Sequence, residues 1–427
     1  MEVPGGLTTP AVEAFKAKQH VLFALRHAKY LPTPYLSEDS NRMTLAYFCL
    51  SALALLPSSA VSTADPALSA LEVTLKPAQR QGFVDWVYEQ QAPTGGFRGS
   101  DSLDVACSQE TTPTTKVENL LPHVPTAPSA ACPAGPSRPP SRTSANLDHP
   151  NIIQSYTALL LLALLADDFS RLDQRALLRF VGDCQNEDGS FSQFPGCPEP
   201  GDPRSSYSAF AVASMLDDWS TIDVEQGLQF LNSCRRYEGG FAQRPGLEAN
   251  AGPTYCAIAS FSLCDRLSSI PDPDRLLRWL AQRQVRPPPP AERSSTESEE
   301  EDEEEEEPVP RDEMAGFQGR ANKPTDACYS FWNVAALKLL RPDLLPNLLD
   351  PSLDRNWLLS CQNKLYGGIA REPGAPPDVY HTYLSLAALS LGDADAVGLR
   401  TLDPAWNVER SVAERIKRSL SRRRRQK

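Results

Sequence analysis

The segment from Gly319 to Trp332 (GRANKPTDACYSFW) combines two cationic side chains, a carboxylate, a thiol and a phenol within fourteen positions. Asp326 and Cys328 are separated by one residue, and His381 begins a later apolar stretch, Tyr380 to Leu391. Carboxylate, thiolate and imidazole groups all bind Zn²⁺, and three protein ligands leave a fourth tetrahedral position open. These residue types suggest a catalytic zinc site made by Asp326, Cys328 and His381.

A purely structural interpretation of these three residues is the alternative. The aspartate could cap a helix, the cysteine could be buried among apolar groups, and the histidine could be satisfied locally. The residues just upstream favour the metal site, because Arg320 and Lys323 offer a guanidinium fork and an ammonium. Together with the hydroxyl of Tyr329, these cations suit a diphosphate beside a metal. A solvated surface pair is the plainer interpretation of the two cations.

A repeated pattern organises the chain that must position these residues. It consists of a helical stretch, a glutamine and a glycine turn that ends in an aromatic or aliphatic residue. Copies lie about fifty residues apart once insertions are removed, which is the length of a helical hairpin, and glycine suits the left-handed backbone that ends a helix. The pattern occurs at Trp86–Phe97, Phe180–Phe191, Phe230–Phe241 (with Arg235 in place of glutamine) and Trp357–Ile369, and a split copy joins Trp279–Gln284 to Ala315–Phe317.

The second stretch of each unit is rich in small and apolar residues, as in Tyr207–Leu216, Tyr255–Leu263 and Tyr329–Leu340. Helices of this composition can pack closely as an inner layer. Strand signals are weak along the whole chain. We therefore predict an all-α fold built from helical hairpins.

Two insertions and a basic end interrupt the repeat. Residues 101–146 are dense in proline, serine, threonine and alanine, and residues 285–314 combine a proline run with ten carboxylates between Glu297 and Glu307. Both compositions predict disorder. The expected organisation is a repeat domain in three parts, residues 1–100, 147–284 and 315–410, divided by these insertions and followed by a basic tail at residues 411–427.

The composition restricts the class of protein. Of the 427 residues, 41% are hydrophobic, which allows a large core, while the 39 prolines agree with the insertions. The net charge of -12 comes largely from the acidic tract, so charge gives no reason to expect a nucleic-acid partner. No apolar run is long enough for stable membrane insertion, and the ten cysteines form no CxxC pair, which favours a cytoplasmic protein with free thiols.

The glycine-turn repeats, the phrase NKPTDACYSFW and the later phrase PPDVYHTYLSLAALSL resemble the β subunits of the protein prenyltransferases. The resemblance covers most of the chain outside the insertions and the tail. It implies an α-α barrel, a toroid of six concentric helical hairpins around an apolar cavity. It also implies that one zinc ion is bound by Asp326, Cys328 and His381.

The resemblance further assigns substrate contacts. It implies that Arg320, Lys323 and Tyr329 hold the diphosphate of an isoprenoid substrate, and that Arg204 lies near the lipid and the terminal carboxylate of the protein substrate. The isoprenoid channel would be lined by Tyr207, Tyr255, Cys256 and Trp332.

The implied reaction joins an isoprenoid to the cysteine thiol of a C-terminal CaaX motif. Zinc would lower the pKa of the substrate thiol from about 8.5, so that thiolate predominates at neutral pH. The diphosphate-binding residues would stabilise charge on the leaving group. Because the family works as a heterodimer with a helical-repeat α subunit, we expect this chain to need that partner.

Two positions favour the type I geranylgeranyl branch of the family. Thr44 matches a position where farnesyltransferases carry a tryptophan, and its smaller side chain leaves room for the fourth isoprene unit of geranylgeranyl diphosphate. Arg371 matches a cation of type I enzymes, where farnesyltransferases place an aspartate that recruits Mg²⁺, so we expect turnover without added Mg²⁺. Type I substrates, such as Rho-type small GTPases, end in CaaX with X often leucine.

Two positions depart from the family pattern. Asn250 stands where the family has a diphosphate-binding histidine and cannot carry a positive charge, and Asn151 replaces a histidine near the peptide pocket.

Three other classes of protein are alternatives. A farnesyltransferase or Rab-type β subunit shares the metal site, a terpene cyclase would need an acidic initiating motif, and a non-catalytic α-barrel module would bind neither zinc nor prenyl diphosphate.

Overall fold

The computed structural model of the chain describes residues 14–61, 65, 67–100, 149–286 and 310–426. The first predicted insertion, residues 101–146, lies outside the described residues, as do positions 287–309 of the second. Among the described helices, none is long and apolar enough to cross a bilayer. The eight cysteines in this part of the chain are all free thiols.

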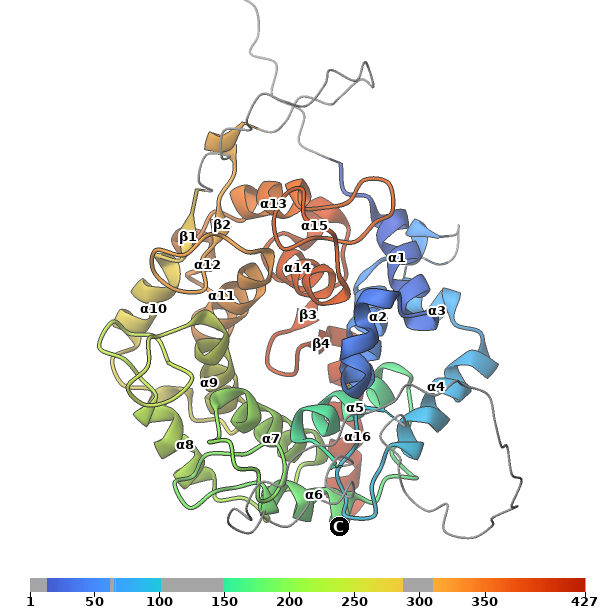
Figure 1. Ribbon diagram of the computed structural model, residues 1–427, viewed down its shortest axis with the longest axis vertical. Helices are drawn as coiled ribbons and strands as arrows, with labels where there is room; N and C mark the ends of the chain where they lie inside the picture. Colours follow the sequence, from blue (N-terminus) through green and yellow to red (C-terminus); the bar gives the residue numbers. More distant parts are fainter. Residues whose placement is uncertain (1–13, 62–64, 66, 101–148, 287–309, 427) are drawn as a thin grey trace, which may run out of the picture.

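Within the described residues, six helices form a closed inner ring, seen end-on in Figure 1. Each packs against the next, and the last packs against the first. Most residues of these helices are buried, including small polar side chains such as Ser206 and Ser260, as expected for helices enclosed on every side. The inner ring consists of α2 (Arg42–Leu55), α5 (Ile152–Leu164), α7 (Pro203–Leu216), α9 (Ala251–Leu263), α11 (Ala327–Leu340) and α14 (Val379–Gly392).

An outer helix precedes each inner helix in the chain and packs against it. The predicted α-α barrel of six hairpins is therefore confirmed. The outer layer consists of α1 (Ala17–Lys29), α4 (Pro77–Glu89), α6 (Gln174–Asp183), α8 (Val224–Ser233), α10 (Pro273–Ala281) and α13 (Pro351–Ser360). Shorter helices, α3 (Ala70–Thr74), α12 (Leu345–Leu348) and α15 (Ala394–Val397), join the layers.

The glycine turns join the outer and inner helices, as the repeat predicts. Gly95 and Gly239 have φ angles of 114° and 118°, which side chains rarely adopt. A Cβ atom on Gly95 would also lie 2.0 Å from the carbonyl oxygen of Ala176 in the next outer helix. The aromatic residues that follow, Phe97 and Phe241, are both 0% exposed. The turns therefore fix the spacing between neighbouring hairpins.

The inner helices begin at one end of the barrel. The first turns of α7, α9, α11 and α14 line a common cavity there. A polar side chain caps each of these four helices, and also α5, by accepting hydrogen bonds from backbone N–H groups of the first turn, which is the preferred role of aspartate and asparagine at a helix start. The caps are Asn151 on α5, Asp202 on α7, Asn250 on α9, Asp326 on α11 and Asp378 on α14.

A two-stranded hairpin, β3 (Leu402–Asp403) and β4 (Val408–Glu409), lies inside the ring in Figure 1. Its turn accepts hydrogen bonds from tyrosine hydroxyls on five inner helices, and we call this set the tyrosine collar. Trp406 of the same turn donates to Ser214 in the last turn of α7, so the hairpin enters from the end opposite the helix starts. The collar consists of Tyr47, Tyr156, Tyr207, Tyr255 and Tyr383.

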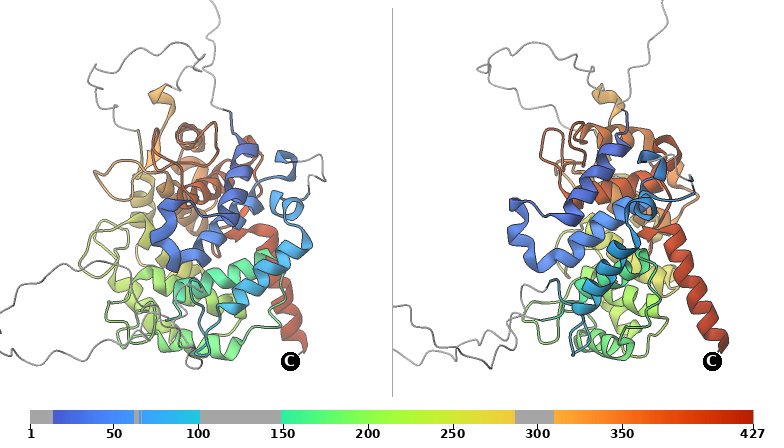
Figure 2. Two further views of the ribbon diagram at one scale, coloured as in Figure 1. Left: turned by 45° about the vertical axis from the view of Figure 1, so that its right-hand side comes forward. Right: turned by 90° about the vertical axis from the view of Figure 1, so that its right-hand side faces the viewer.

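The C-terminal segment differs from the expected basic tail. Helix α16 (Arg410–Gln426) starts directly after β4, and its first turns bury Val412, Ala413 and Ile416. The helix contacts α5 and α7 and extends from the barrel in the side views of Figure 2. The domain therefore continues past residue 410, because apolar residues in this segment are spaced to face the core.

The second insertion is narrower than predicted. Strand β1 (Gln284–Val285) pairs with β2 (Gly316–Phe317), which joins the two sides of the insertion. Met314 packs against the core. Val285 and Met314 thus belong to the barrel, although the composition had assigned both to the insertion.

The ring closes where the N-terminal and C-terminal hairpins meet, and we call this contact the seam. The side chain of Gln362 donates to the carbonyl of Ala14 at 3.0 Å and accepts from the N–H of Lys16 at 3.2 Å. The buried His20 accepts a hydrogen bond from the N–H of Gly368 through Nδ1 at 3.0 Å. These bonds connect residues almost 350 positions apart in the chain.

Candidate metal centre and active site

Asp326 occupies the start of α11 and has two contacts that matter for the site. One carboxylate oxygen, Oδ1, accepts a hydrogen bond from the N–H of Cys328 at 3.0 Å, so the residue is a helix cap. The same atom lies 3.3 Å from Nε2 of His381 on α14. The cap geometry aims the carboxylate at the neighbouring helix, so the structural and functional interpretations of Asp326 are compatible.

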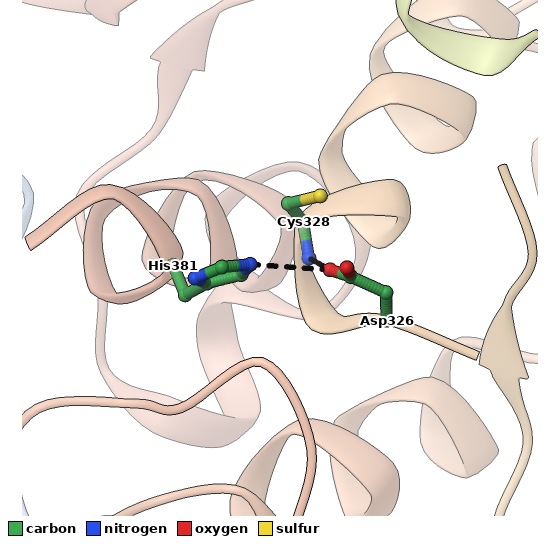
Figure 3. Close-up of side chains that lie close together, drawn as sticks. All are labelled: Asp326, Cys328 and His381. Atoms are coloured by element: carbon green, nitrogen blue, oxygen red, sulfur yellow. Dashed lines mark hydrogen bonds and ion pairs between the residues drawn. The ribbon is translucent and has the colours of Figure 1, made fainter. Parts of the chain in front are cut away.

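The structure brings the three metal-ligand candidates together (Figure 3). The ligand atoms of Asp326, Cys328 and His381 all lie within 4.8 Å of one another. Two ligand atoms that are each 2.0–2.1 Å from a tetrahedral Zn²⁺ ion lie about 3.3 Å apart. The separation of the carboxylate and the imidazole matches this value, so the residues present fit a zinc ion.

Electrostatics in this cluster favour a bound cation. Burial acts to lower the pKa of His381, but hydrogen bonds to Asp326 and Asp378 outweigh it and raise the pKa to about 9. Burial acts to raise the pKa of Asp326, but contacts with His381 and Cys328 bring it below its ordinary value. The two carboxylates therefore create a site of negative potential around the imidazole.

Cys328 is a neutral thiol in this environment. Burial, followed by the charge of Asp326, raises the pKa of its thiol well above the ordinary range. A metal ion reverses this preference, because a coordinating thiol loses its proton. Metal binding at this site would consequently release a proton from Cys328.

Asp378 is a functional candidate that sequence reasoning missed. Its Oδ2 atom lies 2.6 Å from Nδ1 of His381, while its Oδ1 caps α14. This contact leaves Nε2 of the imidazole for a metal, as in the carboxylate–histidine–zinc arrangement. The spacing D-x-x-H at the start of a predicted inner helix was the signal that could have identified it.

A cavity of about 570 Å³ lies beside the cluster at the start of the inner helices. Because the positive ends of several helix dipoles face it, the cavity suits an anion. It collects six of the predicted site residues, which are Arg204, Asn250, Arg320, Cys328, Tyr329 and Trp332. Tyr380, which sequence reasoning did not select, also lines it and precedes His381 directly.

A second cavity, of about 280 Å³, adjoins the first through Arg320 and Tyr329. It brings Lys323, Asp326 and Arg371 together. The Arg371 guanidinium pairs with Glu372 at 2.5 Å, and its backbone carbonyl accepts a hydrogen bond from Ala327 at 2.9 Å. The proposed cations thus surround the metal candidates on two sides.

The predicted lipid contacts divide between two levels of the barrel. Trp332 lines the cationic cavity, and its ring centroid lies 5.3 Å from that of Tyr255. Tyr207 and Tyr255 lie deeper, where their hydroxyls bind the 402–409 hairpin, and Cys256 is buried beside them. Thr44 lies on the opposite part of the ring and donates to Gln154 at 3.0 Å.

The two asparagines that depart from the family pattern are helix caps. Asn151 accepts hydrogen bonds from Ile153 and Gln154 and donates to Gln193. Asn250 accepts from the N–H of Gly252 at 3.1 Å, and it lines the same cavity as Tyr329. Asparagine is among the best N-cap residues, which gives both substitutions a physical reason.

The fold and the site define the class of protein. The model of the prenyltransferase alpha-alpha toroid domain matches residues 15–408. The chain belongs to this family and is a transferase.

Two curated relatives and one solved structure show which members of the family the chain resembles. The chain is 31% identical to the geranylgeranyl transferase type-1 subunit beta of Dictyostelium discoideum, over 92% of this chain and 94% of that protein. It is 32% identical to the subunit of the same name from Arabidopsis thaliana, over 91% and 88%. Candida albicans protein geranylgeranyltransferase-I complexed with GGPP has the same fold, with a TM-score of 0.70 at 22% identity over 95% of this chain and 99% of that chain.

Proposed function

We propose that this chain is the catalytic β subunit of a type I protein geranylgeranyltransferase. It transfers the geranylgeranyl group from geranylgeranyl diphosphate to the cysteine thiol of a C-terminal CaaX motif. The convergence of three metal-binding side chains beside a cationic cavity carries the proposal. The type-1 relatives, which align along nearly the whole chain, support the choice of branch.

Asp326, Cys328 and His381 would hold one zinc ion. When bound, Zn²⁺ lowers the pKa of a substrate thiol and so supplies the thiolate nucleophile at neutral pH. Asp378 orients the imidazole through Nδ1 and maintains its tautomer. The helix cap made by Asp326 holds the carboxylate in place, so both positions are preorganised.

The cations of the two cavities would receive the diphosphate. As the bond between the lipid carbon and the diphosphate oxygen breaks, negative charge grows on the leaving group. Arg320, Lys323 and Tyr329 can offer charge-assisted hydrogen bonds to it. Arg204 lines the same cavity. It would contact the lipid and the carboxylate of the protein substrate. No side chain of this protein needs to form a covalent intermediate.

Two residues would determine the type I branch of the family and the absence of a Mg²⁺ requirement. Thr44 leaves room for a twenty-carbon chain, and Arg371 supplies a fixed positive charge where Mg²⁺ would otherwise assist, so added Mg²⁺ is not needed. The partners are a prenyltransferase α subunit and cytoplasmic proteins ending in CaaX, such as Rho-type small GTPases. The α subunit agrees with the name of the relatives, which are called beta subunits, and the protein substrates follow from the family resemblance alone.

The test uses this chain co-expressed with an α subunit. We expect one zinc per heterodimer, and geranylgeranyl diphosphate should compete out farnesyl diphosphate on a peptide that ends in CaaL. Cys328→Ser should lose zinc and activity. Cys184→Ser, which alters an equally buried thiol elsewhere in the barrel, should retain both. A heterodimer that binds no zinc, or that prefers the fifteen-carbon lipid, would contradict the proposal.

A further inference from the structure

Two arginines face the cavity of 570 Å³, and each is paired with a carboxylate. Arg204 contacts Asp202 at 2.6 Å, and Arg320 contacts Glu248 at 2.8 Å. Glu248 itself lines this cavity. A carboxylate here opposes the binding of an anion, so the two ion pairs need separate explanations.

The Arg204 pair is a fixed part of the barrel. Asp202 caps α7, accepting from the N–H of Arg204 at 2.8 Å, and its side chain is only 13% exposed. The guanidinium contacts both carboxylate oxygens, with Nη2 2.6 Å from Oδ2 and Nε 3.3 Å from Oδ1. Because removing Asp202 would also uncap the helix, the pair is not free to exchange partners.

The Arg320 pair is built differently. Helix α9 is capped by Asn250, so its start does not depend on the carboxylate of Glu248. The side chains of Glu248 and Arg320 are 49% and 42% exposed, and a single contact joins Nη1 to Oε2. A half-exposed pair of this kind is weak, so a stronger anion can displace the carboxylate.

The backbone beneath this pair is held in place. The N–H of Ala251 donates to the carbonyl of Gly319 at 2.8 Å, which joins the first residue of α9 to the segment before α11. A Cβ atom on Gly319 would lie 2.0 Å from the ring of Tyr329, so the ring packs directly on that glycine. Only the side chains of Glu248 and Arg320 therefore need to move for the pair to open.

We infer that Glu248 is an exchangeable counter-anion of Arg320. It pairs with the guanidinium while no diphosphate is bound, gives way when a diphosphate binds, and pairs again when inorganic pyrophosphate leaves. The exchange weakens diphosphate binding and speeds release of the pyrophosphate product. This inference rests on the proposed function, because it assigns a role in the same diphosphate site.

The experiment measures binding of inorganic pyrophosphate and of geranylgeranyl diphosphate to the heterodimer by calorimetry. Removing a competing half-exposed charge predicts that Glu248→Gln binds both ligands about two- to five-fold more tightly. The gain should shrink as salt rises from 0.05 to 1 M, because exposed charges are screened. It should vanish in an Arg320→Gln background, because the effect acts through that guanidinium.

Glu225→Gln is the matched control. Glu225 pairs with Arg266, which follows the C-terminal end of α9, whereas Glu248 precedes the N-terminal end of that helix. Because α9 is about 20 Å long, the control variant removes the same charge far from the cavity. Its affinity for both ligands should equal that of the unaltered protein. An equal gain in this variant would show a general field effect and overturn the inference.

The remaining outcomes separate the inference from the proposed function. If the unaltered heterodimer binds both ligands and Glu248→Gln binds them equally or more weakly, Glu248 is not a competing anion and the inference alone fails. If the unaltered heterodimer binds neither ligand, the proposed function fails as well. Glu248→Ala serves as a second variant, and thermal unfolding confirms that each variant is folded.

Discussion

Asp354 on α13 is a buried carboxyl group that links the outer layer to the metal-bearing helix. It accepts a hydrogen bond from Ser330 Oγ at 2.6 Å, and Ser330 lies on α11 two residues after Cys328. Burial raises the pKa of Asp354 from 3.8 to about 7, although the hydrogen bond from Ser330 opposes the shift. The protonated carboxyl is therefore the form that the folded protein prefers.

The sign of the pH effect follows from this shift. The folded state binds the proton more tightly than the unfolded state, so the stabilisation is complete below about pH 4 and is lost as the pH rises to about 7. A difference of about three pKa units corresponds to roughly 4 kcal/mol. Asp354→Asn keeps the shape and the acceptor for Ser330 but cannot ionise, so it should stabilise the protein by about this amount at pH 8 and by little at pH 4.

The assay is unfolding of the heterodimer monitored by circular dichroism between pH 4 and 8. Asp350→Asn provides a control on the same helix, because the pKa of Asp350 is lowered, chiefly by hydrogen bonding to Ser352. That carboxylate stabilises the fold above the unfolded pKa and loses its contribution on acidification, so its variant should show the opposite trend. A parallel pH dependence for Asp354→Asn and the unaltered protein would refute the reasoning.

Four further predictions concern the active site. Asp378→Asn should weaken zinc binding about 10- to 100-fold, because the imidazole loses its orienting carboxylate, and competition with a chelator measures this loss. Asn250→His should add a cation for the diphosphate but lose a helix cap, so lipid affinity should rise in titrations while the free energy of unfolding falls by about 1 kcal/mol. Thr44→Trp should shift the preference in lipid competition toward farnesyl diphosphate, since the indole fills the space proposed for the fourth isoprene unit. Arg371→Asp should make turnover depend on added Mg²⁺, whereas turnover of the unaltered heterodimer should be unchanged by chelating Mg²⁺.

The repeat made most of the fold predictable from the sequence. The glycine turn fixes both a positive φ and a close helix contact, as at Gly95 and Gly239, so its recurrence marks five of the six hairpins. The hairpin of α1 and α2 lacks this signal. A 3-10 segment, Thr33–Asn41, joins its helices instead. The sixth hairpin was therefore expected only from the family resemblance.

The candidate site was predictable where neighbours in sequence are also neighbours in space. Arg320, Lys323 and Asp326 lie within seven residues, and the structure keeps them around adjoining cavities. Glu248 could not be found in this way, because its partner Arg320 is 72 positions away and only the packing of α9 beside α11 brings the two together.

The tyrosine collar shows a similar limit. Tyr156, Tyr207, Tyr255 and Tyr383 each occupy the fifth residue of an inner helix, which is a regular pattern in the sequence. Their common partner, the turn of the 402–409 hairpin, follows the last inner helix in the chain. Periodicity can indicate that four side chains are equivalent, but it carries no information on which backbone carbonyls they bind.

The seam has a consequence for how the protein folds. Five of the six inner contacts join helices from successive hairpins, whereas α14 must meet α2 across nearly the whole chain. Closing a loop of this length costs roughly 5 kcal/mol of chain entropy, which is recovered only when the whole ring is in place. Nascent hairpins can therefore stack in order during synthesis, but contact between His20 and Gly368 waits for the C-terminal hairpin. Until that hairpin emerges from the ribosome, the incomplete barrel is an open arc with two apolar edges, which is the form a chaperone would have to protect.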